Sequence, residues 1–138
     1  MKVIGFNFKK ISIEKKKDIS SNVNLNFNID IKDVKQPKID IFQGKNLFSF
    51  EYEFKLKYEP DYAEIIFHGD FLVLIEENKL AKEIEKEWKN KRIPDEVSIP
   101  LHNIIIARCN LKALQLEEDL GLPTHSPYPK VSKPKEPN

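Results

Sequence analysis

The 138-residue sequence predicts an α+β fold, in which a four-stranded antiparallel sheet is followed by a short helix and a long C-terminal helix. Three observations favour this fold class. Up to about residue 75, apolar and polar residues alternate along four segments, as in strands with one buried face. Beyond Ile75 the apolar residues recur at helical spacing. A chain of this length fits one domain with its own core.

The first two predicted strands each have one apolar face. Residues 3–13 alternate, change phase at Lys9-Lys10 and then resume, which is typical of a strand with a bulge. Residues 23–31, VNLNFNIDI, alternate strictly, so one face of this strand must be buried. The polar connection between the two strands holds one apolar residue, Ile19.

The next two strands differ from each other in their patterning. Residues 47–58 alternate strongly and form a second two-faced strand. Residues 62–75 are apolar on both faces, which predicts a strand that is covered on two sides or crossed by a bulge at Gly69. The segment before the third strand contains the breakers Pro37 and Gly44 and cannot all be strand.

Two helices complete the domain. Asn78 is placed to cap a helix with a single apolar stripe, which ends by Pro94. The second helix is expected from about Ile99 to Leu120, with Pro100 in its first turn and Gly121 after its end. Because this helix is apolar nearly all round, it should be buried on more than one side. Its apolar lines are Leu101, Ile105, Cys109 and Leu116 on one side, and Ile104, Leu111 and Leu114 on another.

Composition excludes several classes of function. The net charge is +1, from 23 basic and 22 acidic residues, so no strong field attracts nucleic acid or a membrane surface. Without an apolar span or a signal-peptide pattern, the protein is expected to be soluble and cytoplasmic, with no membrane insertion. The Pro- and Lys-rich residues 129–138 have little to bury and are predicted to form a disordered tail after a domain spanning 1–128.

No motif for catalysis, a metal or a cofactor is present. His68, His102 and His125 lack metal-ligand spacing, and no glycine-rich phosphate loop occurs. The single cysteine, Cys109, excludes an intrachain disulfide. It lies two helical turns from His102, about 10 Å along the axis, which favours a shared buried seam over proton transfer. We therefore expect no enzyme and no cofactor.

Charged residues of the long helix have a structural interpretation. The consecutive carboxylates at 117–119 point in different directions and are interpreted as a solvated helix end. Arg108 lies within a helix expected to be buried, where it needs a carboxylate partner. The candidate partners are Asp70 and Glu64.

The order of elements resembles the SecB family of export chaperones. The segment VNLNFNID resembles the second strand of that family, and EIIFHGDFLVLI resembles its fourth strand. The segment HNIIIARCNLKALQLEEDLGLPTHSPYP resembles its long helix and the Gly-x-Pro segment that follows. The resemblance covers about residues 3–130.

Membership of this family would imply a homo-oligomer, a dimer of dimers in which long helices lie between sheets. It also implies long apolar grooves that hold unfolded polypeptide clients in extended form without ATP. Two departures argue against recognition of the SecA motor. The crossover between the first two strands is short, and the polar face of the sheet is rich in Asn and Lys where bacterial members present acidic residues.

Candidate binding residues come from two sources. The resemblance assigns client contacts to the crossover, the second strand and the fourth strand: Ile19, Val23, Leu25, Phe27, Ile65 and Phe67. Further candidates lie on loops or on the one-striped helix: Ile39, Ile41, Phe42 and Trp88. The oligomer interface is expected to use Leu101, Ile104, Ile105, Arg108 and Leu111.

The predicted function is a holdase chaperone for unfolded or nascent polypeptides, supporting protein export or solubility. One alternative is a SecB-like chaperone dedicated to one partner, such as an antitoxin. The other is a structural oligomer without chaperone activity, whose apolar surface is consumed entirely at subunit interfaces.

Overall fold

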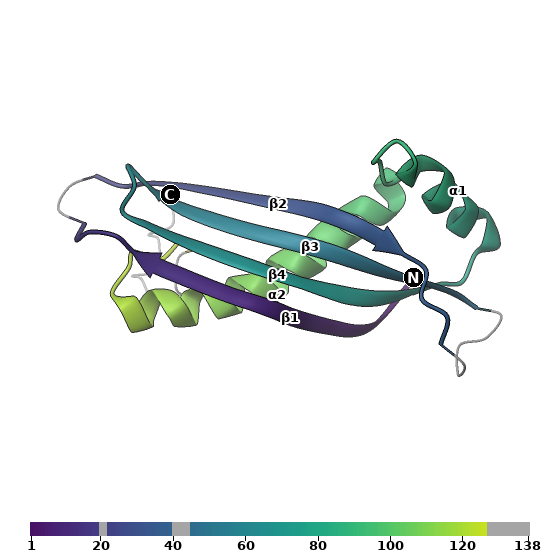
Figure 1. The fold of residues 1–138 in the computed structure, drawn as a ribbon, viewed down its shortest axis with the longest axis horizontal. Helices are drawn as coiled ribbons and strands as arrows, with labels where there is room; N and C mark the ends of the chain where they lie inside the picture. Colours follow the sequence, from purple (N-terminus) through teal and green to yellow (C-terminus); the bar gives the residue numbers. More distant parts are fainter. Residues whose placement is uncertain (20–21, 40–44, 127–138) are drawn as a thin grey trace, which may run out of the picture.

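A computed structural model describes residues 1–19, 22–39 and 45–126. Its elements in chain order are β1 (Lys2–Lys15), β2 (Asn24–Lys35), β3 (Asn46–Glu59), β4 (Ala63–Ile75), α1 (Asn78–Trp88) and α2 (Asp95–Leu120). The strands form one antiparallel sheet in the order β1-β4-β3-β2, which confirms the α+β fold class (Figure 1). Ile41, Phe42 and the predicted tail at 129–138 lie outside the described residues.

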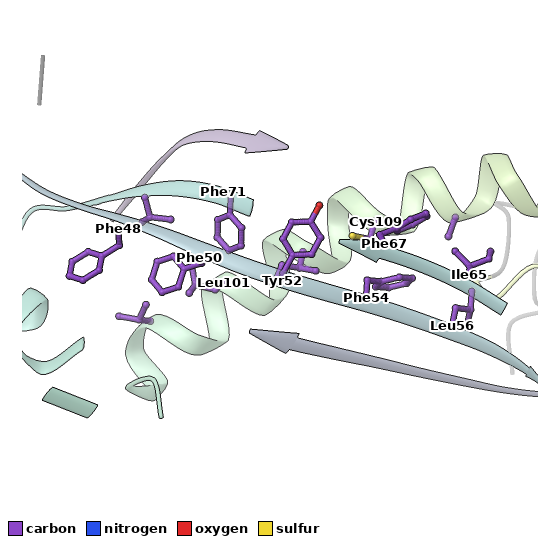
Figure 2. Packing of buried hydrophobic residues seen from close by; sticks show 14 of the residues in the cluster. Phe48, Phe50, Tyr52, Phe54, Leu56, Ile65, Phe67, Phe71, Leu101 and Cys109 are labelled. Atoms are coloured by element: carbon purple, nitrogen blue, oxygen red, sulfur yellow. The ribbon is translucent and has the colours of Figure 1, made fainter. Parts of the chain in front are cut away.

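The alternation of β3 and β4 produces one fully buried sheet face. Every second residue of β3 from Phe48 to Tyr58 is at most 2% exposed, and the odd-numbered residues of β4 from Ile65 to Ile75 are buried as well. Stacked rings join the two strands, as seen for Phe54 and Phe67, whose centroids are 5.5 Å apart (Figure 2). The even-numbered residues of β4 are only half-buried within the subunit. The two central strands therefore supply the floor of the core.

The predicted bulge at Lys9-Lys10 is confirmed by a register shift between Phe8 and Lys10 in β1. The irregularity lies in β1, opposite Gly69, whereas β4 runs through Gly69 without a break in its pairing with β3. Glycine is required at position 69 because the β1 backbone and the Tyr52 side chain approach this residue closely. A Cβ atom there would lie 2.0 Å from the Asn7 carbonyl oxygen and 2.5 Å from the Tyr52 hydroxyl oxygen.

The starts of both helices differ from the sequence prediction. The Asn78 side chain does not cap α1; its oxygen accepts a hydrogen bond from the Asn46 side chain at 2.8 Å. Helix α2 begins at Asp95 rather than Ile99, because Pro94 occupies the N-cap and acidic residues fill the first turn. Pro100 consequently lies inside the helix rather than in its first turn.

The end of α2 is confirmed. Gly121 adopts φ 64°, the left-handed conformation that favours glycine, and the Leu122 amide donates to the Glu117 carbonyl at 2.9 Å. The chain thus turns back from the helix at the predicted glycine.

Helix α2 packs on the apolar sheet face with one continuous line of side chains. The members of this line are spaced four residues apart and are fully buried: Val97, Leu101, Ile105, Cys109, Ala113 and Glu117. Leu116, predicted on this line, is only partly buried. On other sides of the helix, Leu111 is 66% and Ile99 is 62% exposed. One of the two expected buried sides is therefore buried within the subunit.

Replacement of Gly69 by alanine should destabilise the protein by about 2–3 kcal/mol, because the new methyl group overlaps the Asn7 backbone and the Tyr52 ring. Gly5→Ala is the matched control, since a Cβ atom there meets nothing within 4 Å. Urea denaturation of both variants measures the difference. Equal midpoints for the two variants would contradict the close approach at Gly69.

Candidate functional site

An apolar groove lies beside α2, at the start of β2. It encloses about 250 Å³ and is lined by Leu25, Phe27, Phe54, Leu56, Ile106, Asn110, His125 and Ser126. Phe54 and Leu56 in β3 form its floor and are almost fully buried. Phe27 and Ile106 are more exposed, at 59% and 41%. Such a hollow offers apolar contact area to a side chain that enters from solvent.

The groove exists because α2 crosses the sheet on a diagonal (Figure 1). The helix covers the central strands, while β2 is an edge strand whose first residues lie to one side of it. Phe27 therefore rests against the sheet with its ring centroid 6.3 Å from that of Phe54, without a helix above it. Leu25, two residues earlier on the same face, is half-buried.

One wall of the groove is polar and depends on a buried carboxylate. Glu117 is fully buried at the end of α2 and accepts a hydrogen bond from the Tyr58 hydroxyl. The His125 backbone amide donates to Glu117 Oε2 at 2.8 Å, and His125 Nδ1 lies 2.6 Å from Oε1. The other ring nitrogen of His125 contacts Asn110 Oδ1. These contacts tie the segment after α2 to both the helix and the sheet.

Tyr58 is suited to its role as a donor in this cluster. Burial, reinforced by the hydrogen bond with Glu117, raises the pKa of its hydroxyl well above the usual range. The hydroxyl therefore stays protonated and donates to the carboxylate. The interpretation of Glu117 as solvated is wrong, because the buried line of α2 continues through this position. Glu118 and Asp119 are exposed, as expected.

The structure brings together only part of the predicted client-binding set. Leu25 and Phe27 line the groove. Val23 and Ile19, which precede them in the chain, are partly buried against the core. Ile65 and Phe67 must be removed from the set, because they are fully buried beneath α2 and no polypeptide can reach them. Both belong to the helix-facing side of β4, where the family resemblance assigns client contacts.

The remaining client candidates lie away from the groove. Ile39 is 37% exposed after β2. Trp88 is half-buried at the end of α1, with the Lys91 ammonium 4.8 Å from its ring centroid.

The sequence did not indicate four residues of the site, which are Ile106, Asn110, His125 and Glu117. The i+4 series of α2 was the one available signal, since it places Glu117 in the same line as Ala113.

The predicted interface residues divide between two sides of α2. Leu101 and Ile105 cannot line an interface between subunits, because they are fully buried on the sheet of the same chain. Ile104 is half-buried and Leu111 is largely exposed on another side of the helix. These two remain available to a second subunit.

Arg108 also differs from its predicted environment. It is exposed, with its guanidinium carbon 5.9 Å from the Phe6 ring centroid, and so lies against an aromatic ring of β1 rather than a carboxylate. Asp70, a predicted partner, instead lies 3.0 Å from Lys9 and accepts a hydrogen bond from Asn7.

The opposite face of the sheet carries charged residues of both signs, beside apolar even-numbered residues of β4 such as Leu72. Glu53 is only 8% exposed and is surrounded by cationic or ionisable groups, with Lys55 and His68 each at 3.3 Å and Lys32 at 3.8 Å. Acidic residues of β3 on this face are thus accompanied by lysines rather than gathered into an acidic surface.

The described residues hold neither a cluster of potential metal ligands nor a helix suited to span a membrane. No group of three or more His, Cys, Asp or Glu side chains within them is placed to hold a metal ion. No helix among them is long and apolar enough to span a membrane. His102 Nδ1 lies 2.8 Å from the Ser98 carbonyl oxygen, and Cys109 is fully buried in the core.

Comparison with known proteins supports the fold. No protein-family model matches the chain, and no curated protein matches it. Among solved structures, it is similar to the SecB-like chaperone Rv1957 of Mycobacterium tuberculosis, in complex with a ChAD peptide from the antitoxin HigA1 (Rv1956). The TM-score is 0.60 at 8% identity, over 97% of this chain and 92% of that one. The SecB-like resemblance is confirmed at the level of the fold.

Cys109 should be unreactive in the folded protein. Burial raises the pKa of its thiol to about 12, so that about one thiol in ten thousand is ionised at pH 8. A thiol reagent at that pH should modify Cys109 only after denaturant is added. An Asn90→Cys variant, with its new thiol at an exposed residue after α1, should react at once and serves as the control. Rapid labelling of native wild-type protein would contradict the placement of Cys109.

Proposed function

We propose that this protein is a chaperone that holds unfolded or nascent polypeptides in extended form, without ATP and without catalysing a reaction. The observation that carries the proposal is the open apolar groove between β2, β3, α2 and the segment after it. It occurs in a SecB-like fold, and the similar mycobacterial structure was solved with a bound peptide.

The physical character of the groove suits a polypeptide without a defined sequence. An apolar side chain that enters it contributes about 25 cal/mol for each Å² removed from water, whatever its exact shape. Phe27 and Ile106 present such area from two different elements, β2 and α2. Holding would therefore come from repeated small apolar contacts and would support export or solubility of clients.

A second candidate function is a chaperone dedicated to one partner, such as an antitoxin. It is favoured by the similar mycobacterial structure, whose bound peptide comes from an antitoxin. Competition separates the two functions. A general holdase binds many unrelated unfolded chains with similar affinity, whereas a dedicated chaperone strongly prefers one.

We also propose that the active form is a homo-oligomer, a dimer of dimers. Ile104, Ala107, Leu111 and Leu114 recur at alternating three- and four-residue spacing along a side of α2 away from the sheet. This is the spacing with which helices pack against each other. Ala107 and Leu111 are exposed, and the other two are half-buried, so a second copy would cover them.

We do not propose that this protein delivers its clients to the SecA motor. The outer sheet face pairs its carboxylates with lysines, as around Glu53 and Asp70, and so lacks the acidic surface that the SecB resemblance associates with that motor. Cytoplasmic location stays a prediction.

The groove can be tested with a double variant, Phe27→Ser with Ile106→Ser. Loss of two exposed apolar walls should weaken binding of a labelled unfolded polypeptide about tenfold or more, equivalent to about 1.4 kcal/mol. Fluorescence anisotropy without ATP measures the affinity. Ile11→Ser is the control, since Ile11 is 43% exposed on the other edge strand, β1. Wild-type protein that binds no unfolded chain would rule out the chaperone function.

The oligomer can be tested with Leu111→Glu. Leu111 is largely exposed in the subunit, so the charge should leave the fold intact but be unfavourable in an apolar interface. Light scattering should show a smaller mass than wild type, with an unchanged circular dichroism spectrum. Asn90→Glu adds the same carboxylate at an exposed residue after α1, away from this side of α2, and should leave the mass unchanged. A monomeric wild-type protein at micromolar concentration would contradict the proposed assembly.

A further inference from the structure

We propose that Glu117 is a positioning residue of the groove, which anchors the chain after α2 through His125 so that it forms the polar wall. This inference rests on the polypeptide-binding function proposed above. The role belongs to a carboxylate that is part of neither the apolar floor of the groove nor the apolar contacts between α2 and the sheet.

The burial of Glu117 requires a reason. A carboxylate removed from water is unfavourable unless hydrogen bonds satisfy its oxygens, and an apolar residue would continue the buried line of α2 more simply. Glu117 instead receives donors from two separate parts of the chain, the Tyr58 hydroxyl in β3 and the His125 backbone amide at 2.8 Å. One side chain thereby joins the helix, the sheet and the returning segment.

The side chain of His125 extends this connection to the groove. Its Nδ1 lies 2.6 Å from Glu117 Oε1, and its Nε2 contacts Asn110 Oδ1 across the turn. The His125 side chain is only 12% exposed. Asn110, His125 and Ser126 together line the groove, so the contacts that fix His125 also fix the wall.

The wall depends on this anchor more than the fold does. The first residues after α2 are held independently, by the Gly121 turn and by Leu122, which is buried in the core at 6% exposure. Beyond them, the hydrogen bonds of His125 run to Glu117 and Asn110. Loss of the carboxylate should therefore release residues 123–126 and leave the sheet and α2 in place.

A fixed polar wall beside an apolar floor suits an extended polypeptide. The floor accepts an apolar side chain, while the flanking peptide groups of the client need polar neighbours when they leave water. A wall held in place before binding also reduces the ordering cost of association. The ligand class is thus an extended segment that carries an apolar side chain, with its backbone against Asn110 and Ser126.

The test compares Glu117→Gln with Glu118→Gln, the same substitution at the adjacent exposed residue. Hydrogen exchange of the free proteins reports on residues 121–126, and anisotropy with a labelled, reduced and carboxymethylated unfolded polypeptide reports on the groove. In Glu117→Gln we expect the His125 amide to exchange at least tenfold faster and the affinity to fall about tenfold. Glu118→Gln should match wild type in both measurements.

A second variant keeps the test decisive if Glu117→Gln does not fold. His125→Gln leaves the carboxylate with Tyr58 and with the backbone amide, yet removes the ring contacts, and should show the same two effects at smaller size. Where both variants fold, the double variant should lose no more affinity than Glu117→Gln, because the two residues act as one unit.

Each other outcome overturns a specific statement. Faster exchange with unchanged affinity would show that the segment is anchored but does not shape the groove. Lower affinity without faster exchange would show that Glu117 acts by another route. In both cases the inference is wrong while the proposed function stands. If the wild-type protein binds no unfolded polypeptide, the proposed function fails and the inference about the groove fails with it.

Discussion

One helix has to cover the apolar face of a four-stranded sheet, and α2 does so by crossing that face on a diagonal (Figure 1). Over the central strands the cover is complete, and residues such as Leu101 and Cys109 pack directly on the aromatic side chains of β3 and β4 (Figure 2). At the two edge strands the cover ends. Phe27 on β2 and Ile11 on β1 are paired with buried neighbours but remain 59% and 43% exposed. The groove is a direct consequence of this geometry.

The same diagonal explains the acidic residue at the end of the buried line. By residue 117, α2 has passed the aromatic centre and meets the hydroxyl of Tyr58, where a carboxylate can be satisfied. The chain then turns at Gly121 and returns over the uncovered corner, where the carboxylate also receives His125. The apolar floor thus comes from β3, and the polar wall comes from α2 and the segment that follows it.

The two faces of the sheet contribute differently to the protein. The apolar face carries the stability, since a buried aromatic or aliphatic side chain contributes about 1.5–3 kcal/mol. The opposite face carries ion pairs such as Lys9 with Asp70 and Lys35 with Glu51, which are partly exposed. Exposed pairs of this kind contribute about 0–1 kcal/mol each. Their alternation of sign keeps that face well hydrated and limits its use as a binding surface for a strongly charged partner.

The sequence by itself determined the elements, because strand alternation and helical spacing are local properties. It indicated the four strands, the bulge at Lys9-Lys10 and the helix end at Gly121, and all three are confirmed. It also indicated that α2 has more apolar surface than one packing face requires, and Leu111 bears this out within the subunit.

The tertiary structure decided which apolar residues are accessible and which polar residues are buried. Phe27 and Phe67 have the same character in the sequence, yet one lies on an edge strand beside the helix and the other on a central strand beneath it. Glu117 and Glu118 are adjacent and chemically identical, and only the first points at the sheet. Such differences depend on the path of α2 across the sheet, which is set by the packing of residues distant in the chain and has no local signal.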